Sequence, residues 1–159
     1  MKFIVGVMGP GATATAEQLK IAYQIGKAVA ERGHTLLSGG MKGTMAEACR
    51  GAKDAGGLVV GICPTDNADD MCADVDIPIV TGIRGARNFI NILSSKIVIA
   101  IGPWSSGTLS EIAFAIQQRR PLLIIGGTPE MAAYIKQVEP TGREVVFTRS
   151  IDGVKAFLA

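Results

Sequence analysis

Several short segments of this sequence are apolar at every position, and this pattern constrains the fold more than any other feature. Residues Ile97–Ile101 read Ile-Val-Ile-Ala-Ile. A strand of this kind fits a place that is buried on both faces, as strands in parallel sheets are. Parallel neighbours need a crossover connection, usually a helix, and helical patterns alternate with the apolar runs here. We therefore predict an α/β fold, a doubly wound and mainly parallel sheet flanked by helices.

The same alternation places the remaining elements. Apolar runs rich in Val and Ile predict strands, and apolar residues spaced three or four apart predict helices. We expect strands at 3–8, 35–38, 58–63, 77–80, 96–101, 122–125 and 145–147, and helices at 16–32, 44–55, 84–94, 108–119, 130–137 and 151–158. A chain of 159 residues without a linker or internal repeat predicts one domain over residues 1–159.

Composition and charge narrow the classes of partner. Apolar residues make up 48 % of the chain and the net charge is +2, so we expect a compact protein that binds neither nucleic acid nor a membrane. No apolar stretch reaches the roughly 20 residues of a membrane span. The run after Lys2 is short for a signal peptide, and the three cysteines form no Cys-x-x-Cys pair. These features predict reduced thiols and a cytoplasmic location.

Two glycine-rich turns follow predicted strands and precede predicted helices, at 38–44 and 102–108. Such a turn brings unpaired backbone N–H groups and the positive end of a helix dipole to one point, where phosphate or another anion binds. In the first turn, the candidate binding residues are Ser38, Gly39 and Gly40, and the two glycines remove side chains from the approach to the backbone. An ordinary loop before a helix is the alternative. Two such turns predict a phosphorylated small molecule as the ligand.

The second turn carries hydroxyl groups as well as a glycine. Ser105, Ser106, Gly107 and Thr108 converge where the predicted helix begins, and Glu111 follows three residues after Thr108. We expect these residues to hold an anion. The spacing also fits a capping box, in which Thr108 is the N-cap and Glu111 reaches back to its N–H. Both interpretations are compatible with each other.

An earlier turn, at 9–14, has the letters of the dinucleotide-binding pattern G-x-G-x-x-A. That fold uses an acidic residue about 20 positions later, and the second strand and its turn, 34–40, contain none. Pro10 also removes an N–H that a phosphate would use. We therefore expect Gly9 and Gly11 to form a tight turn that lets a ligand approach the backbone, with a purely structural turn as the alternative. The P-loop pattern is absent.

Charged side chains supply further candidates. Arg84 and Arg87 lie at the start of a predicted helix, where a cation opposes the helix dipole. This placement is favourable if an anion binds there, and solvated arginines are the alternative. The acidic residues between Asp66 and Asp76 lack metal-ligand spacing, so we predict a solvated loop and no metal site. His34, the single histidine, suits a helix end better than catalysis, and we expect no catalytic residue.

Five segments of the sequence together carry a resemblance to a known family. They read Val-Gly-Val-Met-Gly-Pro-Gly at 5–11, Leu-Leu-Ser-Gly-Gly at 36–40, Val-Asp-Ile-Pro-Ile-Val-Thr-Gly at 75–82, Ala-Arg-Asn at 86–88 and Ile-Leu-Ser-Ser at 92–95. These segments resemble the molybdenum cofactor carrier proteins over nearly the whole chain. The resemblance implies a Rossmann-like homodimer or homotetramer that stores and transfers molybdenum cofactor without chemical turnover.

The cargo that this resemblance implies is a pterin with a phosphate and a dithiolene-held molybdenum oxide. Gly39, Gly40, Ser106, Gly107 and Thr108 would then hold its anionic groups. Arg87 would add charge-assisted contacts, and Glu111 would fix the second turn or the arginine. Molybdenum insertion proteins or molybdoenzymes would be the partners that deliver or receive the cofactor.

More distantly, the chain is similar to the "lonely guy" phosphoribohydrolases, which carry an Arg-Lys pair and a P-G-G-x-G-T-x-x-E motif. Arg87 matches their catalytic arginine, and Gly107, Thr108 and Glu111 match the end of the motif. Asn88 replaces the lysine, and Pro-Trp-Ser-Ser at 103–106 replaces the Pro-Gly-Gly part and would reshape the pocket. These departures favour binding over hydrolysis of a nucleoside 5′-monophosphate, which is the alternative function. A nucleotide-sensing module without turnover is a third possibility.

Overall fold

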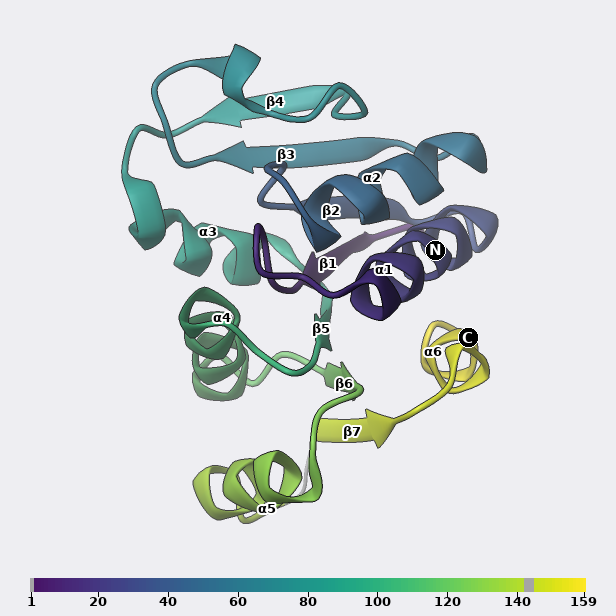
Figure 1. Ribbon diagram of the computed structural model, residues 1–159, viewed down its shortest axis with the longest axis vertical. Coiled ribbons are helices and arrows are strands. Elements are labelled where there is room, and N and C mark those ends of the chain that lie inside the picture. Colours follow the sequence, from purple (N-terminus) through teal and green to yellow (C-terminus); the bar gives the residue numbers. More distant parts are fainter. Residues whose placement is uncertain (1, 142–144) are drawn as a thin grey trace.

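The computed structural model describes residues 2–141 and 145–159 and contains a parallel β-sheet at its centre (Figure 1). Within the described residues the sheet has seven strands in the order β4-β3-β2-β1-β5-β6-β7, and every neighbouring pair is parallel. The strands are β1 (Ile4–Met8), β2 (Thr35–Ser38), β3 (Val59–Cys63), β4 (Ile77–Val80), β5 (Ile97–Ile101), β6 (Leu122–Ile125) and β7 (Val145–Thr148). The prediction of a doubly wound, Rossmann-like parallel sheet is therefore confirmed.

Six helices flank the sheet in the described part of the chain. They are α1 (Ala16–Glu31), α2 (Thr44–Asp54), α3 (Arg87–Ser94), α4 (Ser106–Gln117), α5 (Pro129–Val138) and α6 (Ile151–Phe157). Two single turns of 3₁₀ helix, η1 (Ala68–Asp70) and η2 (Arg84–Ala86), lie in the connections before β4 and α3. None of the described helices is both long and apolar enough to cross a membrane.

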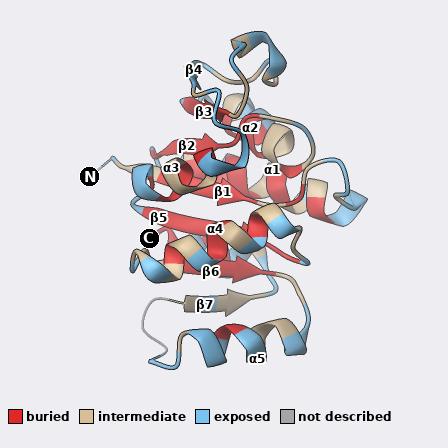
Figure 2. Cartoon of the chain, turned by 90° about the vertical axis from the view of Figure 1, so that its left-hand side faces the viewer, coloured by how far each residue is buried: buried red, intermediate tan, exposed pale blue. Residues whose placement is uncertain are grey.

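The two faces of the sheet are buried by different helices. Along β5, Ile97, Ile99 and Ile101 pack with residues of α1, α2 and α6, whereas Val98 and Ala100 pack with residues of α3, α4 and α5. The alternation follows from the strand period of two, which sends successive side chains to opposite faces. Figure 2 shows the resulting buried centre, with the edge strands β4 and β7 more exposed. The all-apolar sequence of β5 is thus explained by burial on both sides.

The helices α1 and α2 lie unusually close because each presents a glycine to the other. A Cβ added at Gly26 would overlap the carbonyl oxygen of Ala48, and one at Gly51 would overlap that of Tyr23. This close contact places the start of α2 beside the turn that follows β1. The spacing between these two helices therefore determines how the turns of the candidate site meet.

We predict that Gly26→Ala lowers the free energy of unfolding by about 3 kcal/mol, because backbone atoms cannot move aside for the new methyl group. Gly33→Ala is the matched control, since the space around Gly33 is open but its φ is +74°. It should cost only about 1 kcal/mol, from the left-handed backbone. Urea unfolding of both variants measures the difference. Equal costs would show that helix contact at Gly26 does not limit stability.

Candidate functional site

The candidate site lies where β1, β2 and β5 end, because the chain order reverses between β1 and β5 and leaves a crevice there. The turn before α2 packs directly on the turn after β1. Thr44 donates hydrogen bonds to the carbonyl of Pro10 from its N–H (3.0 Å) and from its hydroxyl (2.8 Å). A Cβ added at Gly43 would overlap the carbonyl of Gly11. Glycine at 43 thus lets the two turns form one continuous wall.

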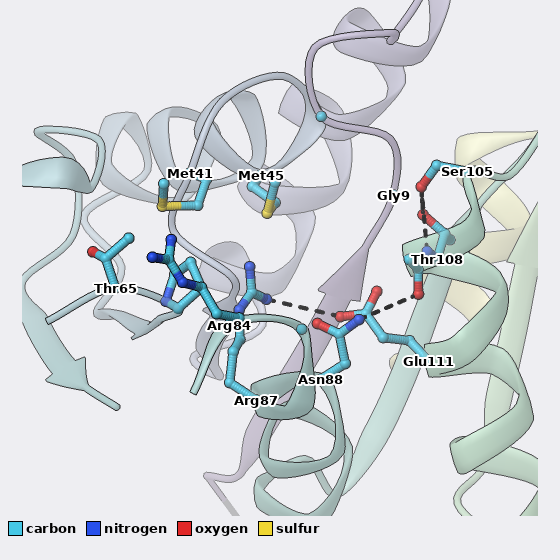
Figure 3. A pocket seen from close by; sticks show the side chains of 14 residues that line it. Gly9, Met41, Met45, Thr65, Arg84, Arg87, Asn88, Ser105, Thr108 and Glu111 are labelled. Carbon is cyan, nitrogen blue, oxygen red and sulfur yellow. Dashed lines mark hydrogen bonds and ion pairs between the residues drawn. The ribbon is translucent and has the colours of Figure 1, made fainter. Parts of the chain in front are cut away.

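A cavity of about 480 Å³ opens beside this wall (Figure 3). It is lined by residues of the turns after β1, β2 and β5, of the β3 end, of the η2 segment and of the first turns of α2, α3 and α4. The lining residues are Gly9, Gly11, Met41, Met45, Pro64, Thr65, Arg84, Gly85, Arg87, Asn88, Ser105, Gly107, Thr108 and Glu111. Seven of the predicted binding residues are among them: Gly9, Gly11, Arg87, Ser105, Gly107, Thr108 and Glu111. Gln18 holds the β5–α4 turn from outside, because its side-chain amide donates to the Pro103 carbonyl at 2.9 Å.

The helix after β5 begins two residues before its predicted start at Thr108. The helix α4 starts at Ser106, and Ser105 is the N-cap, whose hydroxyl accepts the N–H of Thr108 at 3.3 Å. The predicted capping box, with Thr108 as N-cap and Glu111 reaching back to it, is therefore wrong. Ser105, three residues before Thr108, offers the same capping chemistry one turn earlier. Ser105, Gly107 and Thr108 line the cavity, and the amides of Ser106 and Gly107 begin the helix without intrahelical partners.

Four predicted residues, all in the described part of the chain, lie outside the cavity lining: Ser38, Gly39, Gly40 and Ser106. In the turn after β2, the Ser38 hydroxyl accepts the N–H of Gly40 at 3.0 Å, and the Gly40 carbonyl accepts the N–H of Cys72 at 2.8 Å. The Gly40 amide is thus already used within the protein. Trp104 packs against the hydrophobic cluster that includes Ile92 of α3 and Ile112 of α4, and it is not among the lining residues of the cavity.

Gly39 makes room for the side chain of Arg87. A Cβ at position 39 would overlap the Arg87 guanidinium. Arg87 is only 7 % exposed, and its Nε has no hydrogen-bond partner among the described residues. Burial lowers the pKa of Arg87 below its ordinary value, although the charge of Glu111 opposes this shift. A buried guanidinium that lines a cavity is suited to binding an anion.

Glu111 is the acidic partner of this arginine. Its Oε1 lies 4.0 Å from Arg87 Nη1 and accepts a hydrogen bond of 2.9 Å from the buried side-chain amide of Asn91. Burial raises the pKa of Glu111 to about 7, and the Asn91 hydrogen bond and the Arg87 charge only partly oppose the rise. The carboxyl group therefore titrates near neutral pH. Glu111 was expected to contact either the turn after β5 or Arg87, and the structure shows the contact with Arg87.

Comparison with known proteins identifies the family. A model of the SLOG cluster4 family matches residues 2–154. The chain belongs to the SLOG cluster4 family. A molybdenum cofactor binding protein from Rippkaea orientalis has a TM-score of 0.90 and 40 % identity, covering 100 % of this chain and 99 % of that one. The predicted resemblance to molybdenum cofactor carrier proteins is confirmed.

Two further relatives lie at a similar distance. The molybdenum cofactor carrier protein of Chlamydomonas reinhardtii has a TM-score of 0.91 and 39 % identity, covering 99 % of this chain and 96 % of that one. An uncharacterized protein of Archaeoglobus fulgidus is 41 % identical over 140 residues, which is 80 % of this chain and 90 % of the relative. The two solved structures match 99 to 100 % of this chain, so these matches include the segments that form the candidate site.

Sequence reasoning missed several residues of the site in this SLOG cluster4 protein. Asn88 joins α3 to α4, because its amide donates to the Ser110 hydroxyl at 3.0 Å. Asn91 orients Glu111, as described above. The signal for Asn91 was its position one helical turn after Arg87, on the same side of the predicted helix. Met41, in the turn after β2, and Met45, in the first turn of α2, also line the cavity, and their sequence context carries no comparable signal.

We predict that Glu111 makes stability depend on pH between its unfolded and folded pKa. The folded pKa of about 7 lies above the ordinary value of 4.5, so the folded state keeps a proton that the unfolded state has lost. The free energy of unfolding should therefore fall by about 3 kcal/mol as pH rises from 4.5 to 7, and then level off. Urea unfolding at several pH values, with Glu111→Gln as control, isolates this contribution. Superimposable pH profiles of the two proteins would contradict it.

Proposed function

We propose that this protein binds and carries molybdenum cofactor without changing it chemically. The observation that carries the proposal is the match, over nearly the whole of both chains, to solved proteins named as molybdenum cofactor binding and carrier proteins. The cavity lies at the sheet position where ligands of doubly wound folds bind. Its volume of about 480 Å³ is in the range of small-molecule sites.

The polar groups of the cavity suit the phosphate of such a cargo. Ser105, Gly107 and Thr108 surround the first turn of α4, whose dipole and free amides favour negative charge. The buried guanidinium of Arg87 faces the same space and would add charge-assisted hydrogen bonds. Gly9 and Gly11 would let the pterin approach the backbone of the turn after β1. Gly39 would leave room for Arg87, and Ser38 and Gly40 would hold the turn that contains Gly39. Ser106 would contribute its amide at the start of α4.

Phosphoribohydrolase activity is less well supported. In that family a lysine follows the arginine, whereas here Asn88 follows it and its side chain is bound to Ser110. The relatives that match the full chain at about 40 % identity carry cofactor-binding names. Release of a base from a nucleoside 5′-monophosphate, lost in Glu111→Gln, would reverse this assignment.

We also propose that the protein works as a homo-oligomer in the cytoplasm, with molybdenum insertion proteins or molybdoenzymes as partners. Two surfaces support self-association. The outer side of α4 is apolar, with Leu109 39 % exposed, and the single acidic or basic residue of this helix, Glu111, is buried. The edge strand β4 exposes Ile77 and Ile79. Apolar patches of this kind are typical of interfaces.

We predict that Arg87→Ala weakens binding of molybdenum cofactor by roughly 10- to 100-fold, the value of a charge-assisted hydrogen bond. Gly39→Ala should weaken binding in the same direction, because the new Cβ displaces the guanidinium without removing it. Arg50→Ala is the matched control, since Arg50 lies on the exposed side of α2 and pairs with Glu47. Anaerobic equilibrium titrations measure all four proteins.

Circular dichroism and thermal unfolding establish that each variant is folded before its affinity is compared. Unchanged affinity in folded Arg87→Ala and Gly39→Ala would contradict the role of the guanidinium. An equal loss in Arg50→Ala would show that overall charge, rather than the cavity, determines affinity.

A further inference from the structure

Arg84 has a backbone conformation that non-glycine residues rarely adopt. Its φ is +56°, in the left-handed region, and it precedes Gly85 in the η2 turn. Glycine at position 84 would relieve the conformation without crowding, and the chain instead has a large charged residue there. A strained residue next to a cavity is often one whose side chain is needed at that place.

The surrounding backbone holds this conformation firmly. The N–H of Arg84 donates to the Pro64 carbonyl at 2.8 Å, and the N–H of Gly82 donates to the Thr65 carbonyl at 2.9 Å. The N–H of Thr81 adds a third bond to the Cys63 carbonyl at 3.2 Å. These bonds attach the segment before η2 to the end of β3. The backbone of Arg84 is therefore held beside the cavity, although its side chain is exposed.

The Arg84 side chain lines the same cavity as Arg87. Within the part of the chain that the structure describes, no carboxylate forms an ion pair with Arg84, and Glu111 pairs with Arg87 alone. The nearby Thr65 hydroxyl donates to Asp70 at 2.6 Å. The cavity thus contains two guanidinium groups and a single carboxyl group, whose pKa is itself raised. Like charges in one cavity repel unless a ligand supplies negative charge.

The two arginines differ in position along the cavity. In Figure 3 Arg84 lies with Met41 and Thr65 on one side, Ser105 and Thr108 lie on the other, and Arg87 with Glu111 lies between them. The α4 side offers amides and hydroxyls, the groups that typically surround a phosphate. The Arg84 side offers a planar fork of N–H donors and polarisable thioethers. The two ends therefore suit two different anionic groups.

We propose that Arg84 binds the molybdenum oxide end of the cargo while the phosphate lies at the start of α4. The inference rests on the proposed function, and it adds a residue that distinguishes metal-loaded cofactor from the metal-free pterin. The guanidinium donates to oxygen atoms on the metal, and Met41 and Met45 pack against the sulfur-bearing part of the ligand. Metal-free molybdopterin has the phosphate but lacks those oxygen atoms.

The test compares two ligands, molybdenum cofactor and metal-free molybdopterin, on wild type, Arg84→Ala, Arg84→Gly and the control Arg50→Ala. Both changes at Arg84 should weaken cofactor binding roughly tenfold and change molybdopterin binding by less than about twofold. Arg84→Gly should melt at a higher temperature than Arg84→Ala, because glycine accepts the positive φ. A folded variant that binds poorly then reports the missing side chain and not a damaged fold.

Unchanged cofactor affinity in both Arg84 variants overturns the proposal. Equal losses for the two ligands also overturn it, because they place Arg84 at a group that both ligands share. Wild-type protein that binds neither ligand contradicts the proposed function itself, which separates the two failures.

Discussion

The site depends on one buried guanidinium. Arg87 extends from the first turn of α3 past the bare backbone of Gly39 to within 4.0 Å of Glu111 on α4. This side chain therefore brings the turn after β2 together with α3 and α4. Burying a cation is costly unless charge and hydrogen bonds compensate. Glu111 supplies part of the compensation, and an anion in the cavity that Arg87 lines would supply more.

The cost of this arrangement is visible in its neighbours. The carboxyl group of Glu111 is so well buried that its pKa rises to about 7, so its charge near neutral pH is sensitive to what occupies the cavity. An anion beside Arg87 would compete with Glu111 for the guanidinium. Ligand binding and the protonation of Glu111 are thus coupled through the same arginine.

The fold could be predicted from the sequence because its signals are local. The all-apolar run of β5 and the glycines that end the helices mark most elements within one or two residues, whereas α3 begins at Arg87, three residues after its predicted start, because residues 84–86 form the η2 turn. The site was predictable as far as it depends on turns, since Gly107, Thr108 and Glu111 lie near one another in the chain. The role of Gly39 was not predictable, because it depends on Arg87 crossing from a helix 48 positions later. The N-cap of α4 at Ser105 was not predictable, because two serines and a threonine in this turn all fit an N-cap.

The central claim is that this cavity selects molybdenum cofactor over a nucleotide. An anaerobic equilibrium titration of the purified protein with molybdenum cofactor, repeated with adenosine monophosphate as competitor, tests it most directly. The account predicts saturable cofactor binding that the nucleotide barely displaces. Clear nucleotide binding without cofactor binding would contradict it and direct the search to phosphoribohydrolase substrates.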